Sequence, residues 1–188
     1  MMVRVKPVHA LCFFSVSLLG DVNQLLVFDY YDPDLYYAKL VERKLIDYEL
    51  ETIASNMQDY LDEEKVLVNG RRVYPEVRHI DIAFRGTPKN PSIYFIIYFK
   101  GYLKPGENTY EDYYESERVE YDYEFYWIFP PGVQVKKVVI DGFYTINNNI
   151  LSVYVERGSY VKGYEKIVFD IPQYLFKIPL SFNQNTQE

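Results

Sequence analysis

The chain has 188 residues, enough for one domain with its own hydrophobic core. Hydrophobic residues make up 48% of it and charged residues 25%, a composition that excludes a disordered chain. The formal net charge of −7 argues against binding to nucleic acid or to an anionic membrane surface, because both need basic patches. The charge is compatible with a cationic ligand or a basic protein partner.

The predicted elements begin with a β-hairpin at residues 10–30, in which residues 20–23 form the turn. Basic residues before the first apolar segment are typical of a signal peptide, but polar residues interrupt that segment and no small-residue cleavage site follows it. We therefore interpret it as a strand. It contains the single cysteine, Cys12, which we expect to be buried and unreactive. A chain with one cysteine forms no intrachain disulfide, and we expect a cytoplasmic location.

One long amphipathic helix is predicted over residues 33–61, because apolar residues recur there every three to four positions. Asp32 is a suitable N-cap and Pro33 suits the first helical turn. A break near Ser55-Asn56 is the alternative to a continuous helix.

Residues 65–182 alternate short apolar segments with turn residues, which predicts an antiparallel β region. Asn69-Gly70 is the strongest hairpin signal. Residues 92–99 are apolar on both faces and predict a central strand that is covered on both sides. A last edge strand over 175–182 is interrupted by a proline.

The fold class that follows is α+β and predominantly β, with antiparallel, sandwich-like sheets and the helix packed on a sheet. We expect a single domain over residues 1–182 and a frayed tail over 183–188. Residues 66–86 and 138–158 share four identities when they are aligned without gaps. Shared turn chemistry explains those identities better than a true repeat.

A strictly alternating segment at residues 118–129 carries the candidate binding site. Val119, Tyr121, Tyr123, Phe125, Trp127 and Phe129 share one face, which predicts a strand with a buried side. The opposite face is acidic, and the chain has 21 tyrosines, a residue that favours strand rims and binding faces. The candidate binding residues are Glu120, Asp122, Glu124 and Tyr126 of this face, together with Glu115 and Glu117 of the preceding loop.

The spacing of these carboxylates argues against a metal site. Alternate residues on a strand lie about 6.5–7 Å apart, which is too far for three neighbours to bind one calcium ion at about 2.4 Å. We therefore predict no metal and no cofactor. Arg71, Arg72, Arg78 and His79 form a small basic group that is either a solvated strand face or an anion pocket.

The sequence has no phosphate-binding glycine loop, no nucleophile elbow and no zinc-protease motif. This pattern favours a non-enzymatic protein-interaction or assembly module, which binds a protein partner or associates with itself. One alternative is a carboxylate-based hydrolase, in which a divalent cation could assist Glu120, Asp122 and Glu124. Another is an acidic mimic of nucleic acid that binds a basic partner.

Overall fold

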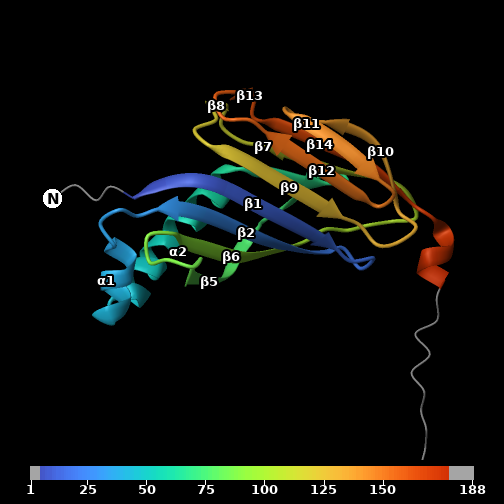
Figure 1. The fold of residues 1–188 in the computed structure, drawn as a ribbon. Coiled ribbons are helices and arrows are strands. Elements are labelled where there is room, and N and C mark those ends of the chain that lie inside the picture. The colour runs from blue at the N-terminus through green and yellow to red at the C-terminus, as the bar shows by residue number, and fades with distance from the viewer. Residues whose placement is uncertain (1–4, 178–188) are drawn as a thin grey trace, which may run out of the picture.

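Strands account for most of the chain in a computed structural model that describes residues 5–177 (Figure 1). In chain order the elements are β1 (Lys6–Val16), β2 (Asp21–Tyr31), α1 (Tyr36–Glu42), α2 (Ile46–Glu63), β3 (Lys65–Val68), β4 (Arg71–Val73), β5 (Glu76–Phe84), β6 (Pro91–Lys100), β7 (Gly106–Tyr113), β8 (Glu117–Arg118), β9 (Asp122–Ile128), β10 (Gln134–Val139), β11 (Phe143–Asn147), β12 (Ile150–Val155), β13 (Tyr160–Val161), β14 (Tyr164–Ile171) and the 3₁₀ helix η1 (Gln173–Lys177).

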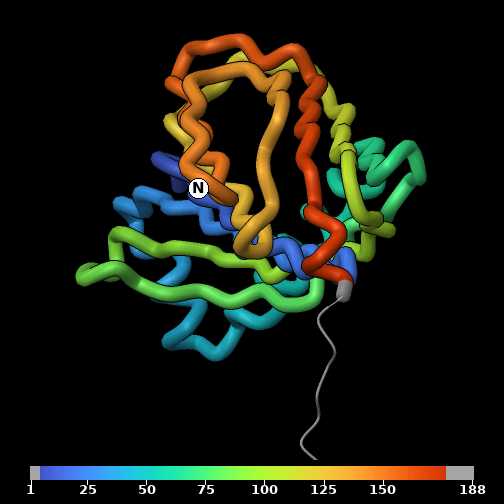
Figure 2. The backbone as a smooth tube through the Cα atoms, turned by 90° about the vertical axis from the view of Figure 1, so that its right-hand side faces the viewer, coloured from blue at the N-terminus to red at the C-terminus, as the bar shows by residue number. Residues whose placement is uncertain are grey.

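Two large sheets face each other and form the body of the protein. The larger has seven strands in the order β11-β12-β9-β1-β2-β6-β5, and the smaller has five in the order β10-β14-β7-β3-β4. A two-stranded ribbon of β8 and β13 forms a separate small sheet, and Val161 of β13 packs in the main core. Figure 1 shows the two helices beside β5 and β6, and Figure 2 gives a side view with α1 at the lower edge and the C-terminal strands above. The α+β, predominantly β class is therefore confirmed.

One pairing differs from the expected antiparallel arrangement. Strand β9 lies parallel to β1, whereas every other pair in the two large sheets is antiparallel. The parallel pair joins strands that are more than a hundred positions apart in the chain, for example Cys12 with Phe125. The seven-stranded sheet is consequently mixed.

The first hairpin is confirmed, with β1 and β2 in antiparallel register from Lys6↔Tyr31 to Val16↔Val22. Its turn requires glycine at position 20, where φ is 84° and a Cβ would lie 2.0 Å from the carbonyl oxygen of Gly101. The backbone N–H of Gly101 donates to the carbonyl of Gly20 over 2.8 Å, so the turn is fixed to the end of β6.

The predicted long helix is two helices. Helix α1 ends in a Schellman motif: Leu45 N–H donates to the carbonyl of Leu40, and Lys44 N–H donates to that of Val41. Lys44 occupies the left-handed position of the motif, with φ of 58°. The break lies here and not near Ser55, because α2 is continuous through that position.

The helix also begins later than predicted. Its N-cap is Leu35, not Asp32, and Leu35 has a left-handed φ of 57°. Asp32 nevertheless supports the helix start, because its Oδ2 accepts a hydrogen bond from Tyr37 N–H over 3.0 Å. Asp32 is fully buried and lies before the helix, where its carboxylate accepts a hydrogen bond from a backbone N–H of the first helical turn.

The β predictions hold in most places. The hairpin of β3 and β4 is confirmed, with Asn69 at φ 51° and Gly70 at φ 74°, as a type I′ turn requires. Strand β6 is internal to its sheet, between β2 and β5. Its inner side chains are buried, whereas Tyr94, Ile96 and Tyr98 on the other face are only partly covered, so the prediction of cover on both sides is wrong.

Two further expectations concern the C-terminal half. Residues 173–177 form η1 where a last strand was predicted; residues 178–182 of that strand and the tail at 183–188 lie outside the described residues. The apparent repeat has no structural counterpart. Gly70 closes a hairpin within the smaller sheet, whereas Gly142 lies in the connection from β10 in the smaller sheet to β11 in the larger.

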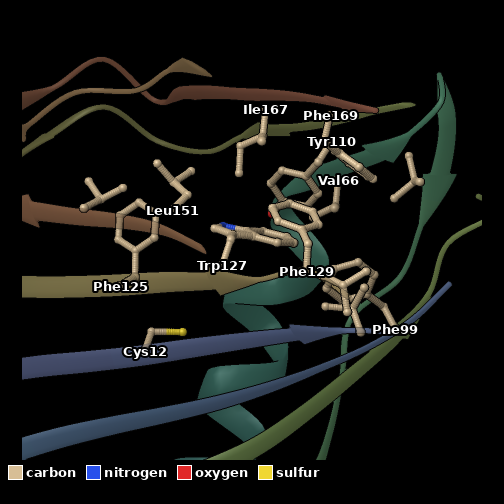
Figure 3. Packing of buried hydrophobic residues seen from close by; sticks show 14 of the residues in the cluster. Cys12, Val66, Phe99, Tyr110, Phe125, Trp127, Phe129, Leu151, Ile167 and Phe169 are labelled. Atoms are coloured by element: carbon tan, nitrogen blue, oxygen red, sulfur yellow. The ribbon is translucent and has the colours of Figure 1, made fainter. Parts of the chain in front are cut away.

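An aromatic core joins the two sheets (Figure 3). Trp127 stacks on Phe14 with ring centroids 4.2 Å apart and meets Tyr110 of the opposite sheet at 4.4 Å. Phe129 contacts Phe169 at 4.6 Å in the same way. A second cluster packs the helices on β6, with Leu50 and Leu61 of α2 against its inner residues. The larger sheet thus divides its inner face between the smaller sheet and the helices.

Candidate functional site

The alternating segment forms the strand that the sequence predicts, although it is shorter. Val119, Phe125, Trp127 and Phe129 are buried, which confirms the inner face. Strand β9 begins only at Asp122, and residues 120–121 form a bend before it. Glu120 therefore does not continue the row of carboxylates along the strand.

The outer-face candidates are engaged with neighbouring groups. An oxygen of Asp122 accepts a hydrogen bond from Arg157 N–H over 2.7 Å, and Glu124 accepts one from the Tyr126 hydroxyl, also over 2.7 Å. The Tyr126 ring stacks on Phe13 with centroids 4.9 Å apart. These contacts explain why the outer face of β9 is only partly exposed.

A cavity of about 330 Å³ lies between the two sheets, beside the first residues of β9. Its floor comes from the inner faces of β1, β2 and β9, and its roof from β7, β14 and the residue that follows α2. Glu117 and Glu120 line the cavity, whereas Glu115, Asp122 and Tyr126 do not. Glu124 borders it, but its carboxylate lies on the outer face beside Tyr126 and 3.9 Å from His9 Nε2. The structure thus divides the six candidates into two groups.

Three further carboxyl groups line this cavity, and sequence reasoning missed them. They are Glu64 after α2, Asp112 on β7 and Glu165 on β14. The Tyr114 hydroxyl donates to Glu165 over 3.1 Å, and the Tyr110 hydroxyl donates to Oδ2 of Asp112 over 3.1 Å. The other oxygen of Asp112 is buried and has no hydrogen-bond partner among the described residues.

Burial raises the pKa of all three of these carboxyl groups. Desolvation is the main cause, and it brings the pKa of Glu64 and that of Glu165 to about 8. The negative charge of Asp112 raises both values further. The pKa of Asp112 is itself raised by burial, against the opposing effect of hydrogen bonds from Tyr110 and the Tyr113 backbone. No cation contributes to any of these shifts.

The charge of the cavity wall has one sign. Five carboxyl groups line it, and no Lys, Arg or His is among the described residues that do so. The rest of the wall is apolar or aromatic, and includes Phe14, Leu26 and Phe28 on one side and Tyr121 and Tyr123 near the acidic residues. A ligand in this cavity would therefore contact aromatic rings and carboxyl groups at the same time.

Cys12 also lines the cavity, but its thiol is poorly suited to chemistry. It is 7% exposed, which confirms the predicted burial. Desolvation raises the pKa of the thiol to about 12, so the nucleophilic thiolate is scarce at neutral pH.

The basic candidates are placed on two strands of different sheets. Arg71 and Arg72 lie on β4, where they stand over the rings of Tyr102 and Tyr74. Arg78 lies on β5, where it pairs with Glu76 at 2.6 Å, and its neighbour His79 meets the Tyr94 ring at 6.4 Å between centroids. None of the four lines the cavity, and the anion pocket stays a prediction.

A polar row on the outer face of the larger sheet contains His9, Asp29 and Ser92. The Ser92 hydroxyl donates to Asp29 over 2.5 Å, and His9 Nδ1 lies 3.7 Å from the same carboxylate. Asp29 thus stands between the hydroxyl and the imidazole. A nucleophilic triad needs the imidazole next to the hydroxyl, and this order does not provide it.

Two searches of the described residues complete the survey of the molecule. Within residues 5–177, no group of three or more His, Cys, Asp or Glu side chains is placed to hold a metal ion. Neither α1 nor α2, the two α-helices in that range, is long and apolar enough to cross a membrane.

No family model and no curated protein matches the sequence. Among solved structures, an M1 zinc metallopeptidase from Deinococcus radiodurans is similar at 9% identity and a TM-score of 0.36, over 87% of this chain and 42% of its own. An aminopeptidase N family protein from Idiomarina loihiensis is similar at 9% identity and a TM-score of 0.39, over 85% of this chain and 29% of its own. A putative protease from Parabacteroides distasonis is similar at 5% identity and a TM-score of 0.34, over 89% of this chain and 40% of its own. Similarity at this level assigns neither a family nor an activity.

Proposed function

We propose that the protein is a non-enzymatic interaction module and that its cavity receives a positively charged group of the partner. The single observation that carries this proposal is the one-signed cavity wall, in which the carboxyl groups of Glu64, Asp112, Glu117, Glu120 and Glu165 meet no basic side chain of the described residues. The ammonium or guanidinium end of a protruding Lys or Arg side chain is the group that this wall fits.

The raised pKa values support a cationic occupant. A buried carboxyl group that has a cation beside it keeps a low pKa, whereas Glu64 and Glu165 have pKa values of about 8. Their shifts therefore show that no basic side chain of the described residues supplies a positive charge to these two carboxyl groups. A bound cation would supply that charge, and it would offer a hydrogen-bond donor to the unpartnered oxygen of Asp112.

The size and the rings of the cavity narrow the choice of occupant. A volume of about 330 Å³ is at the lower end of the range for ligand pockets, which suits a single side chain or a small amine. Tyr121 and Tyr123 add aromatic rings, whose faces attract cations. The apolar residues of β1 and β2 would contact the alkyl part of the ligand.

Binding of small probes to the intact chain tests the proposal. We expect n-butylammonium and n-butylguanidinium to bind in a calorimetric titration at pH 9, where the carboxyl groups are ionised, and to bind more weakly at pH 6. Neutral n-butanol, which has the same alkyl chain, should bind least. Glu165→Gln should weaken binding of both cations about tenfold or more, because it removes a carboxylate from a desolvated site.

Glu107→Gln is the matched control, since Glu107 is an exposed carboxylate on β7 and does not line the cavity. Its affinity for both cations should equal that of the wild type. Equal affinity for the butyl cations and for butanol, or the same loss in both variants, would contradict a cation site in the cavity.

The carboxylate hydrolase is the second candidate, and one observation favours it. A general acid needs a raised pKa in a cleft, and Glu64 and Glu165 now meet both conditions. A panel of nitrophenyl glycosides and esters tests this function. Turnover that disappears in Glu165→Gln and persists in Glu107→Gln would favour the hydrolase over the interaction module.

A further inference from the structure

We propose that two copies of this chain associate through strand β11. The β11 strands of the two copies pair antiparallel about a twofold axis and join the two seven-stranded sheets into one. This inference does not depend on the cavity, because no residue of β11 lines it. It rests on a comparison between the free edges of the two large sheets.

Within residues 5–177 the two large sheets have four free edges, and three of them carry features that hinder pairing with another chain. Strand β5 has a bulge between Val77 and His79, and β10 has one between Val135 and Lys137. Strand β4 has three residues, of which two are arginines. Bulges, short strands and charged side chains are the usual means by which proteins protect sheet edges.

Strand β11, the fourth edge, has none of these features. Its sequence is Phe-Tyr-Thr-Ile-Asn, without a charge or a proline, and its pairing with β12 is regular over all five residues. All five residues are exposed, including Phe143 at 73%, Tyr144 at 46% and Ile146 at 43%. Every second residue of such an edge turns its backbone N–H and C=O away from its one neighbour.

The order of residues in β11 makes the strand complementary to itself. An antiparallel pair centred on Thr145 places Thr145 opposite Thr145 of the second copy, and Tyr144 opposite Ile146 of that copy. Aromatic residues opposite β-branched residues and threonine opposite threonine are favourable cross-strand pairs, and no like charges meet.

The inner face supplies the apolar contact. Tyr144 and Ile146 are in register with Val153 and Leu151, whose side chains are buried in the core. Pairing of two copies would therefore extend the apolar inner face across the axis and cover Tyr144 and Ile146. A second copy is the favoured occupant because one uncharged strand satisfies both sides of a twofold interface.

Sedimentation of the full chain over a hundredfold range of concentration tests the proposal. We expect a reversible monomer–dimer equilibrium, since a five-residue interface is small. Thr145→Lys should raise the dimer dissociation constant at least about tenfold, because it places two positive charges against each other at the axis. Ala83→Lys on β5 is the matched control and should leave the constant unchanged, since Ala83 is an exposed residue of the other edge strand.

A cysteine variant tests the register directly. Thr145→Cys should form a covalent dimer under mild oxidation, because residues opposite each other at the axis have adjacent Cβ atoms. Ala83→Cys should not, and the native Cys12 is buried. A strict monomer at every concentration would overturn the proposal. So would a dimer that Thr145→Lys leaves intact and Thr145→Cys does not cross-link.

Discussion

Lys44 is the residue that divides the N-terminal helical region. It has a left-handed backbone conformation that costs a non-glycine residue about 1 kcal/mol or more, yet it occupies the position where helices most often place glycine. The apolar periodicity continues from α1 through this position into α2, and for that reason the sequence predicts one helix. A glycine at position 44 would have marked the break, and a lysine does not.

Replacing Lys44 by glycine should therefore stabilise the protein. We expect Lys44→Gly to raise the free energy of unfolding by about 0.5–1 kcal/mol, because glycine adopts this conformation without strain. The midpoint of urea unfolding measures the change. Glu51→Gly, at an exposed position inside α2, is the control. It should lower the free energy of unfolding by about as much as Lys44→Gly raises it. Equal losses in both variants would show that φ at position 44 is not strained.

At the scale of elements, the hairpins were the most predictable parts of the fold and the loops between sheets the least. Asn69-Gly70 determines its turn through two positive φ values, and both are local properties. The segment between β6 and β7 depends instead on Asn108, which is fully buried. Its side chain hydrogen bonds to the Lys104 and Gly106 backbones and to Asn69, which is 39 positions away. No local pattern reveals such a contact.

Asn108 should consequently be sensitive to substitution. Asn108→Ala removes four hydrogen bonds and leaves part-buried polar groups of the loop without these partners, so we expect a loss of about 2–4 kcal/mol in the free energy of unfolding. Chemical denaturation measures it. Gln134→Ala, an exposed change on β10, should cost less than about 0.5 kcal/mol. Similar losses in the two variants would remove the proposed role of Asn108.

At the scale of the whole molecule, the cavity wall is assembled from distant parts of the chain. The sequence predicted Glu117 and Glu120 as candidates because they lie in or next to the alternating segment. Glu64, Asp112 and Glu165 come from three other parts of the chain, namely the C-cap of α2, β7 and β14. Only the pairing of β7 with β14 and the facing of the two sheets bring them together. Periodicity assigns a side chain to a face of a strand, but it does not show which face will lie opposite.

This assembly makes the stability of the protein depend on pH. The carboxyl groups of Glu64 and Glu165 have a pKa of about 8 in the folded chain, against an ordinary value of 4.5 in the unfolded chain. Between these values the folded state binds more protons than the unfolded state, so rising pH favours unfolding. The stability that these groups contribute is present at pH 4.5 and is lost as the pH rises through 8.

We therefore expect the midpoint of urea unfolding of the wild type to fall between pH 5 and pH 9. Glu165→Gln should reduce this fall, because an amide has no proton to release, and Glu107→Gln should leave it unchanged. A saturating butyl cation should also reduce the fall, since it stabilises the ionised carboxylates of the folded state. If the midpoint stays level from pH 5 to pH 9 in the wild type, the carboxyl groups are not desolvated, and they then give no support to a cation site in the cavity.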